Sequence, residues 1–277
     1  MGIELPRRSM LFVPGIDERK IRKSAELAAD SVILDLEDSV PPGDKERARE
    51  LISKLLPELE WRRELCVRIN TLYSIDGILD IVHVSKWDKV TCIVIPKAEG
   101  DLGFIYKATG RNIVPLIETA RGFSRIEDIA RSEGVVAITW GPADLALSVG
   151  GEVSAYENNI YIRSLIAITA SAYGIDAIDK VYFKIEDLEG FRRDALEAKK
   201  LGYVGKTVIH PTQIEISNEI FTPSREEIEW ARKVIELFEQ ASRMGKGATR
   251  MGGQMIDAVH YRIARKILER VPEDLKR

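Results

Sequence analysis

Asn112-Ile-Val-Pro-Leu-Ile-Glu-Thr119 is an apolar, strand-like run that ends in an acidic side chain, Glu118. A second run at residues 135–140 repeats the pattern, because Gly-Pro-Ala-Asp follows it directly and delivers Asp144. The two acids are 26 positions apart, which is about the length of one strand-helix repeat. If the two strands are parallel neighbours, both carboxylates project from the same sheet edge, where α/β folds place their sites.

Two carboxylates that converge at one edge could hold a hard divalent cation. Mg²⁺ is typically bound by one or two carboxylates together with water and substrate oxygens, so we favour a magnesium site at Glu118 and Asp144. The alternative is structural: each acid caps the helix that follows it or pairs with an arginine.

Strand-like and helix-like runs alternate along the rest of the chain. Ser124 with Glu127 and Ser224 with Glu227 match the capping-box pattern of a helix start. The strand-like runs are residues 9–13, 31–36, 65–69, 92–95, 112–117, 135–140, 178–183 and 206–209. Eight such units over about 240 residues predict an α/β fold, the (β/α)8 TIM barrel. A doubly wound open sheet would normally show a glycine-rich fingerprint after its first strand, and Pro14-Gly15-Ile16-Asp17 is not one.

The character of the sequence changes after Ser242, where a short basic loop rich in glycine precedes a last helix over about residues 256–270. A barrel is closed by its eighth unit. We therefore assign residues 1–240 to a TIM-barrel catalytic domain and residues 241–277 to a C-terminal helical extension. The extension could pack on its own barrel or cover the active site of a neighbouring subunit.

The composition limits the class of protein. The 277 residues include 41 basic and 44 acidic side chains, and the net charge of -3 gives no reason to expect a nucleic-acid or membrane surface. No apolar run is long enough to span a membrane, and the first residues lack the apolar core of a signal peptide. Cys66 and Cys92 each lie in an apolar run, so we expect buried thiols and a reducing, cytoplasmic location.

Polar side chains follow most of the predicted strands. They are Glu37, Asp38, Arg68, Asn70, Lys97, Glu118, Asp144 and His210. The sequence suggests neither a Ser-His-Asp triad nor a nucleophilic cysteine near a strand end. An acid-rich mouth with one arginine suits metal-assisted chemistry on a small, oxygen-rich anion, with Arg68 stabilising a developing oxyanion. The structural alternative for Glu37 and Asp38 is a pair with Arg68 or a turn cap.

Seven motifs, in chain order, carry a resemblance to a known family. They are Arg8-Ser-Met-Leu-Phe-Val-Pro-Gly15, Leu34-Asp-Leu-Glu-Asp-Ser39, Val67-Arg-Ile-Asn70, Ile95-Pro-Lys97, Ile117-Glu-Thr-Ala-Arg-Gly122, Gly141-Pro-Ala-Asp-Leu145, and Ile209-His-Pro211 through Phe221-Thr-Pro223. Together they resemble the citrate lyase β-subunit branch of the HpcH/HpaI aldolase family, close to malyl-CoA and citramalyl-CoA lyases. The resemblance implies a TIM barrel, usually a homotrimer or hexamer, that uses Mg²⁺ to cleave or form the carbon-carbon bond of 3-hydroxyacyl-CoA thioesters.

The resemblance also implies roles for individual residues. Glu118 and Asp144 look like the metal ligands, and Arg68 looks like the clamp on the thioester or keto oxygen. Glu37 and Asp38 resemble residues that support this arginine and metal-bound water. Arg8 and Arg19 resemble positions that contact CoA.

The tail, Gly245-Lys-Gly-Ala-Thr249 and Gly253-Gln-Met-Ile-Asp257, is similar to that of malyl-CoA and citramalyl-CoA lyases. In those enzymes the residue matching Asp257 enters the neighbour's active site as acid/base. The alternative for Asp257 is an ordinary N-cap of the last helix. Gly-Pro-Ala-Asp stands where many members have Gly-Ala-Glu-Asp, and this difference bears on the choice of 2-oxo acid: glyoxylate, pyruvate or oxaloacetate.

Three other functions compete with a lyase that releases acetyl-CoA from a free CoA thioester. One is the β-subunit of a citrate lyase complex, which acts on citryl groups on an acyl carrier protein. Another is a non-catalytic subunit that binds CoA esters, and the third is a pyruvate aldolase that uses free acids. The intact set of Arg68, Glu118, Asp144 and Asp257 favours catalysis over binding alone.

Overall fold

The computed structural model describes residues 6–271 and contains a closed barrel of eight parallel strands, which confirms the predicted fold. The strands are β1 Ser9–Pro14, β2 Ser31–Asp35, β3 Glu64–Arg68, β4 Cys92–Ile95, β5 Asn112–Ile117, β6 Ala137–Trp140, β7 Asp176–Asp179 and β8 Gly205–Val208. Each strand pairs with the next along the chain, and β8 closes the ring by pairing with β1. All strand carboxyl ends therefore meet at one end of the barrel, where a TIM barrel carries its site.

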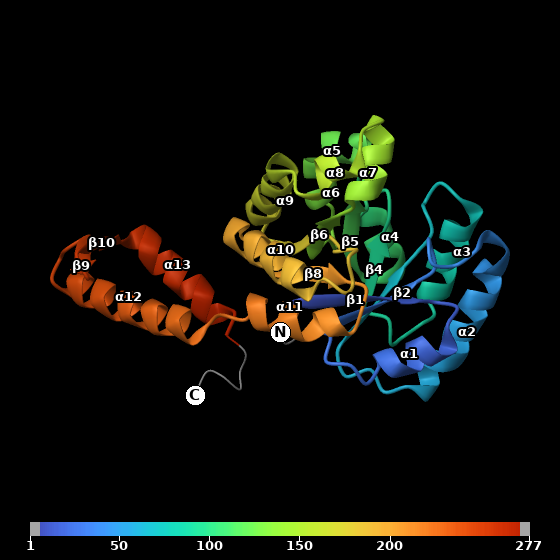
Figure 1. Cartoon of the computed structure of the whole chain (residues 1–277), viewed down its shortest axis with the longest axis horizontal. Coiled ribbons are helices and arrows are strands. Elements are labelled where there is room, and N and C mark those ends of the chain that lie inside the picture. The colour runs from blue at the N-terminus through green and yellow to red at the C-terminus, as the bar shows by residue number, and fades with distance from the viewer. Residues whose placement is uncertain (1–5, 272–277) are drawn as a thin grey trace. The chain divides into compact units, whose positions relative to one another are not determined.

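Helices cover the outside of the strands (Figure 1). They are α1 Glu18–Ser24, the 3₁₀ helix η1 Pro42–Asp44, α2 Lys45–Glu58, α3 Ile75–Val84, α4 Gly103–Thr109, α5 Ala120–Ser124, α6 Ile126–Ala130, α7 Pro142–Val149, α8 Val153–Glu157, α9 Ile160–Tyr173, α10 Leu188–Leu201 and α11 Thr212–Phe221. The predicted capping box at Ser124 is wrong, because Ser124 ends α5 and its hydroxyl donates to the Arg121 carbonyl. None of the helices formed by residues 6–271 is both long and apolar enough to cross a membrane.

Pro115 explains a break between β5 and β6. A proline has no N–H to donate to a neighbouring strand. Strand β5 pairs with β6 only after this proline, through Leu116 opposite Thr139 and Ile117 opposite Trp140. Before it, Ile113 forms an isolated bridge with Val135. The strand predicted from residue 135 therefore begins at Ala137.

The seventh strand begins two residues earlier and ends four residues earlier than predicted, at 176–179 rather than 178–183. Asp176 opens the strand opposite Ala137, and its carboxylate pairs with Arg7 at 3.0 Å. The apolar residues that follow Asp179 do not extend the strand. Val181 and Phe183 instead line a cavity at the carboxyl end of the barrel.

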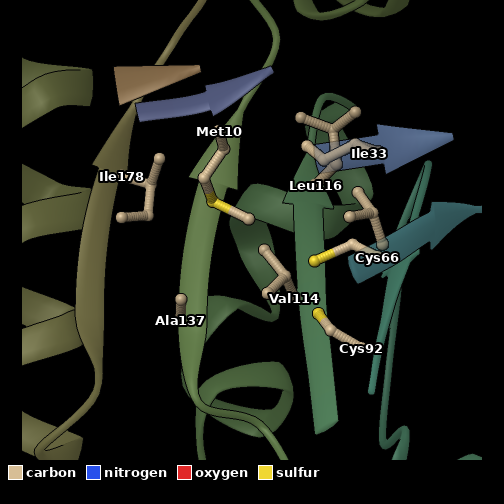
Figure 2. Packing of buried hydrophobic residues seen from close by; sticks show 9 residues of the cluster. Met10, Ile33, Cys66, Cys92, Val114, Leu116, Ala137 and Ile178 are labelled. Carbon is tan, nitrogen blue, oxygen red and sulfur yellow. The ribbon is translucent and has the colours of Figure 1, made fainter. Parts of the chain in front are cut away.

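Apolar side chains from β1 to β7 pack together in the barrel interior (Figure 2). The buried members are Met10, Ile33, Cys66, Cys92, Val94, Val114, Leu116, Ala137 and Ile178. Both cysteines are buried and free, as predicted. This packed layer gives the strand ends above it a rigid base.

The chain divides into two compact units, residues 1–218 and 219–277, so the division falls before the predicted boundary after residue 240. The second unit contains α12 Arg225–Arg243, β9 Ala248–Met251, β10 Gln254–Asp257 and α13 Ala258–Glu269. The strands form an antiparallel hairpin, and the two helices lie side by side (Figure 1). The unit has its own small core of Ala231, Val234, Ile256 and Ala264. Since α12 buries its apolar face in that core, it belongs to the extension.

Candidate functional site

Glu118 and Asp144 converge at the carboxyl end of the barrel. Glu118 directly follows β5, and Asp144 lies in the first turn of α7, which follows β6. One ammonium nitrogen, Lys97 Nζ, lies 3.8 Å from Glu118 Oε1 and 3.7 Å from Asp144 Oδ1. Both carboxylates are therefore within reach of a single bound cation.

The structural alternative for these two acids does not hold. The residue that caps α5 is Thr119, and the N-cap of α7 is Gly141, so neither acid caps the helix beside it. Within residues 6–271, the only ion pairs of Glu118 and Asp144 are those with Lys97. The two carboxylates are thus placed together with one shared lysine and without an arginine.

The environment of Glu118 favours a cation. Its side chain is buried, and burial followed by the nearby charges of Asp144 and Glu37 raises the pKa of Glu118 to about 8. A divalent ion would stabilise the ionised form against both effects. Two carboxylate oxygens of this kind fit Mg²⁺, a hard cation that prefers oxygen ligands.

Gly141 makes room for the Glu118 carboxylate. A Cβ atom at this position would lie 2.6 Å from Glu118 Oε2 and 3.1 Å from Glu118 Cβ. Its backbone is in the ordinary extended region, with φ at -122°. The glycine is therefore required by the close approach of the acid and not by its own conformation.

Arg68, at the end of β3, is held by Asp35, a residue that is not among the polar groups predicted at the strand ends. Arg68 Nε donates to Asp35 Oδ1 at 2.6 Å and Nη2 donates to Asp35 Oδ2 at 2.8 Å. The two residues are register partners on β2 and β3. The guanidinium also lies over the Phe12 ring, 4.9 Å from its centroid. This bidentate pair fixes the planar cation against the cavity wall.

Glu37 and Asp38 both approach Arg68, as predicted, but they differ in burial and in how they contact the guanidinium. Asp38 is largely exposed, and it accepts a hydrogen bond from Arg68 Nη1 at 3.3 Å. Glu37 is buried, and its Oε2 lies 3.2 Å from Arg68 Nη1 without a hydrogen bond of good geometry. Its other oxygen accepts from Lys97 Nζ at 2.6 Å. Glu37 thus lies between Arg68 and Lys97, and Lys97 in turn lies near the two predicted metal ligands.

A cavity of about 400 Å³ opens over these groups. Its polar lining includes Asp35, Asp38, Arg68, Glu118 and Asp144. Its apolar lining includes Phe12, Leu116, Trp140, Val181, Phe183 and Ile209. Few polar groups in an apolar cavity are typical of a site for a small molecule.

The structure separates the two predicted CoA contacts. Arg8 precedes β1, so it lies at the amino end of the strands, opposite the cavity. Its guanidinium donates to both carboxylate oxygens of buried Asp30, at 2.7 and 2.9 Å. The structure therefore places Arg8 in an ion pair away from the cavity, and the contact of Arg8 with CoA stays a prediction. Arg19 is exposed on α1, which follows the carboxyl end of β1.

Asp257 is an N-cap in the second unit. Its Oδ1 accepts from the backbone N–H groups of Val259 and His260, and His260 Nδ1 lies 2.7 Å from the same oxygen. The hydrogen bonds from His260 lower the pKa of Asp257 below its usual value. The side chain is about one-third exposed.

Two other strand-end residues have local roles. Asn70 donates to the Leu36 carbonyl and to Asp80 Oδ2, at 2.9 and 2.8 Å. The Nδ1 atom of His210 lies 2.8 Å from Thr212 Oγ1. Neither residue lines the cavity.

Known proteins resemble this chain over most of its length. The family described as HpcH/HpaI aldolase/citrate lyase matches residues 8–211. The mitochondrial citramalyl-CoA lyase of Mus musculus is 34% identical over 95% of this chain and 86% of its own. A (3S)-malyl-CoA thioesterase of Cereibacter sphaeroides is 34% identical over 95% and 94% of the two chains. The crystal structure of CitE from Mycobacterium tuberculosis with magnesium, acetoacetate and coenzyme A is 33% identical, has a TM-score of 0.80, and covers 97% of this chain and 99% of its own.

Proposed function

The chain belongs to the HpcH/HpaI aldolase/citrate lyase family, and from that premise we propose that it is a magnesium-dependent carbon-carbon lyase of 3-hydroxyacyl-CoA thioesters. Substrates of the citramalyl-CoA, malyl-CoA or citryl-CoA type would yield acetyl-CoA and a 2-oxo acid. The observation that carries the proposal is the convergence of Glu118 and Asp144 beside Arg68 on one cavity. The relative crystallised with magnesium, acetoacetate and coenzyme A supports the same ligand chemistry.

Glu118 and Asp144 would hold the magnesium ion. When bound, Mg²⁺ supplies a Lewis acid for the carboxylate and keto oxygens of the 2-oxo acid. The chain's own contribution is to keep two hard oxygen donors side by side in one cavity, where their mutual repulsion favours cation binding.

The proposed cleavage breaks one carbon-carbon bond and includes two proton transfers, one from the 3-hydroxyl and one to the enolate carbon. A carboxylate base takes the proton of the 3-hydroxyl, the hydroxyl oxygen becomes the new keto group, and the carbon-carbon bond breaks. Its electron pair stays on the acetyl-CoA portion as an enolate, whose oxygen Arg68 stabilises. A proton delivered to the enolate carbon then completes acetyl-CoA. Removing one oxyanion donor of this kind typically costs about 10²- to 10³-fold in rate.

We assign the proton transfers to Asp257 from a neighbouring subunit of a homotrimer or hexamer. The second unit supports this assignment, because the two elements that meet at Asp257, β10 and α13, carry exposed apolar side chains: Met255 is 61%, Val259 51% and Ile263 46% exposed. An exposed apolar patch beside a carboxylate suits docking against another subunit. The free thiols of Cys66 and Cys92 support the proposed cytoplasmic location.

A specific observation favours a second candidate, hydrolysis of the thioester. One relative with 34% identity is a (3S)-malyl-CoA thioesterase, and it matches 95% of this chain. A water molecule admitted to the same cavity would attack the thioester carbonyl and release free CoA. Lyase and thioesterase therefore differ in their CoA-containing product.

The test is to incubate the protein with acetyl-CoA, Mg²⁺ and, in separate tubes, glyoxylate, pyruvate or oxaloacetate, and to follow CoA species by mass. A new thioester in one tube, lost with EDTA and in Asp144→Ala but kept in Asp88→Ala, supports the lyase. Asp88 is a matched control because it is fully exposed. In a separate incubation with a 3-hydroxyacyl-CoA, release of free CoA without acetyl-CoA would identify a thioesterase. No product from folded protein contradicts a lyase of free CoA thioesters, and activity on an acyl carrier protein would then identify a citrate lyase β-subunit.

A further inference from the structure

Lys97 has an unusual backbone beside the predicted metal ligands. It follows β4 and Pro96, and its φ of 49° makes it the one non-glycine residue with a positive φ among residues 6–271. A side chain is crowded in this left-handed conformation, so surrounding contacts must hold it. In this conformation its backbone N–H donates to Glu118 Oε1 at 3.0 Å.

The ammonium of Lys97 lies among three carboxylates. It donates to Glu37 Oε1 at 2.6 Å, and it lies 3.7 Å from Asp144 Oδ1 and 3.8 Å from Glu118 Oε1. The side chain is about one-third exposed, while Glu37 and Glu118 are buried. The nitrogen thus has one directional bond, to Glu37, and two looser contacts with the predicted metal ligands.

These distances distinguish two kinds of interaction. At 2.6 Å the bond to Glu37 is a charge-assisted hydrogen bond, whereas contacts near 3.7 Å act through charge alone. A divalent cation held by Glu118 and Asp144 would lie close to the same ammonium and would be repelled by it. The ammonium can remain on Glu37 when its two looser contacts are given up.

We propose that Lys97 is a positioning residue of the metal site with two separable parts. Its left-handed backbone aims one N–H at Glu118 and fixes the orientation of that carboxylate. Its ammonium is an internal counter-cation that stabilises Glu118 and Asp144 together before the metal binds and weakens metal binding afterwards. This inference rests on the proposed magnesium site and adds what sets the affinity of that site.

The test measures metal affinity and does not require turnover. Mn²⁺ binding to purified full-length protein is followed by the loss of the electron paramagnetic resonance signal of free Mn²⁺. Lys97→Met keeps the apolar stem and removes the charge, and Lys97→Gln is used alongside it. Lys107→Met is the matched control, because Lys107 is an exposed lysine on α4 paired with Glu133. Thermal unfolding in EDTA reports the stability of the metal-free form.

We expect both Lys97 variants to bind Mn²⁺ at least tenfold more tightly than wild type and to unfold at a lower temperature in EDTA. Lys107→Met should match wild type in both. Wild-type or weaker Mn²⁺ affinity in the Lys97 variants would overturn the inference, since a purely structural lysine cannot improve metal binding when it is lost. If wild type itself binds no Mn²⁺, the proposed magnesium site fails, and the inference fails with it.

Discussion

Substitution of Gly141 by alanine should damage the metal site with little effect on folding. The new Cβ would lie 2.6 Å from Glu118 Oε2, whereas ordinary contact begins near 3.4 Å, so the oxygen must move by roughly 0.8 Å. Mg²⁺ requires ligands near 2.0–2.1 Å in close to octahedral geometry, and metal sites tolerate only about 0.2 Å of error. A misplacement near 1 Å in an active site costs about 10²-fold in rate, and we expect a fall of that size in kcat/KM.

The stability of the same variant should change little. Glu118 Oε2 is the far end of a side chain and can rotate, and the backbone of Gly141 is one that alanine adopts freely. Alanine also restricts the unfolded chain, which stabilises by about 0.4–1 kcal/mol and offsets the strain at Glu118 Cβ. We therefore expect a Tm within about 4 °C of wild type.

Steady-state kinetics across a Mg²⁺ titration and a thermal melt form the assay. Gly43→Ala is the control, because a Cβ there has nothing within 4 Å. We expect the control to keep wild-type activity. If folded Gly141→Ala keeps kcat/KM within twofold of wild type at limiting Mg²⁺, then Glu118 does not bind the metal in the orientation described, and the reasoning is refuted.

Three further predictions follow from the site. Asp35→Asn removes the bidentate partner of Arg68, so kcat should fall by about 10²-fold or more, and unchanged kinetics would show that the arginine needs no such support. In EDTA, the pKa of Glu118 is raised in the folded state, so between about pH 4.5 and 8 the folded state binds a proton that the unfolded state has released. The contribution of Glu118 to stability is therefore complete below about pH 4.5 and is lost as the pH rises through about 8. Melts from pH 5 to 9 should therefore show a falling Tm, which Glu118→Gln should flatten; an unchanged slope in Glu118→Gln contradicts the assignment. Arg8→Met should lower the free energy of unfolding by roughly 3 kcal/mol or less in denaturant titrations, because it breaks the ion pair with Asp30. It should leave the KM for the CoA thioester unchanged, whereas Arg19→Met should raise that KM. A raised KM in Arg8→Met with an unchanged KM in Arg19→Met would support contact of Arg8 with CoA.

The barrel was predictable because its strands are buried and regularly spaced. A strand covered on one side by helices and on the other by the barrel interior is a continuous apolar run, and eight such runs separated by amphipathic helices leave few alternative folds. Boundaries were less predictable. Val181 and Phe183 are apolar side chains that line the cavity, and sequence alone does not separate this cause from burial in a strand.

Site residues were predictable where their position after a strand is enough to place them at the site. They were not predictable where their role depends on which residues of two strands pair. Glu118 and Asp144 follow strands, so the fold brings them to one edge. Asp35 lies inside an apolar run, and its role depends on the parallel register that sets it opposite Arg68. A register is a long-range property, which local patterns do not contain. The place of Arg8 follows from chain position alone: a residue before the first strand must lie at the amino end of the barrel, away from the cavity.

The two interpretations of Asp257, helix cap and acid/base, are compatible in physical terms. The bonds from Val259 and His260 use one carboxylate oxygen and keep the group ionised, which is the form that can accept the proton of a 3-hydroxyl. A pKa this low makes a weak base, however, and burial of the exposed face around Met255 against another subunit would raise it towards the operating pH. Under the proposed function, docking of the second unit would therefore do more than deliver the acid. It would also tune Asp257 to accept a proton and then return it to the enolate carbon.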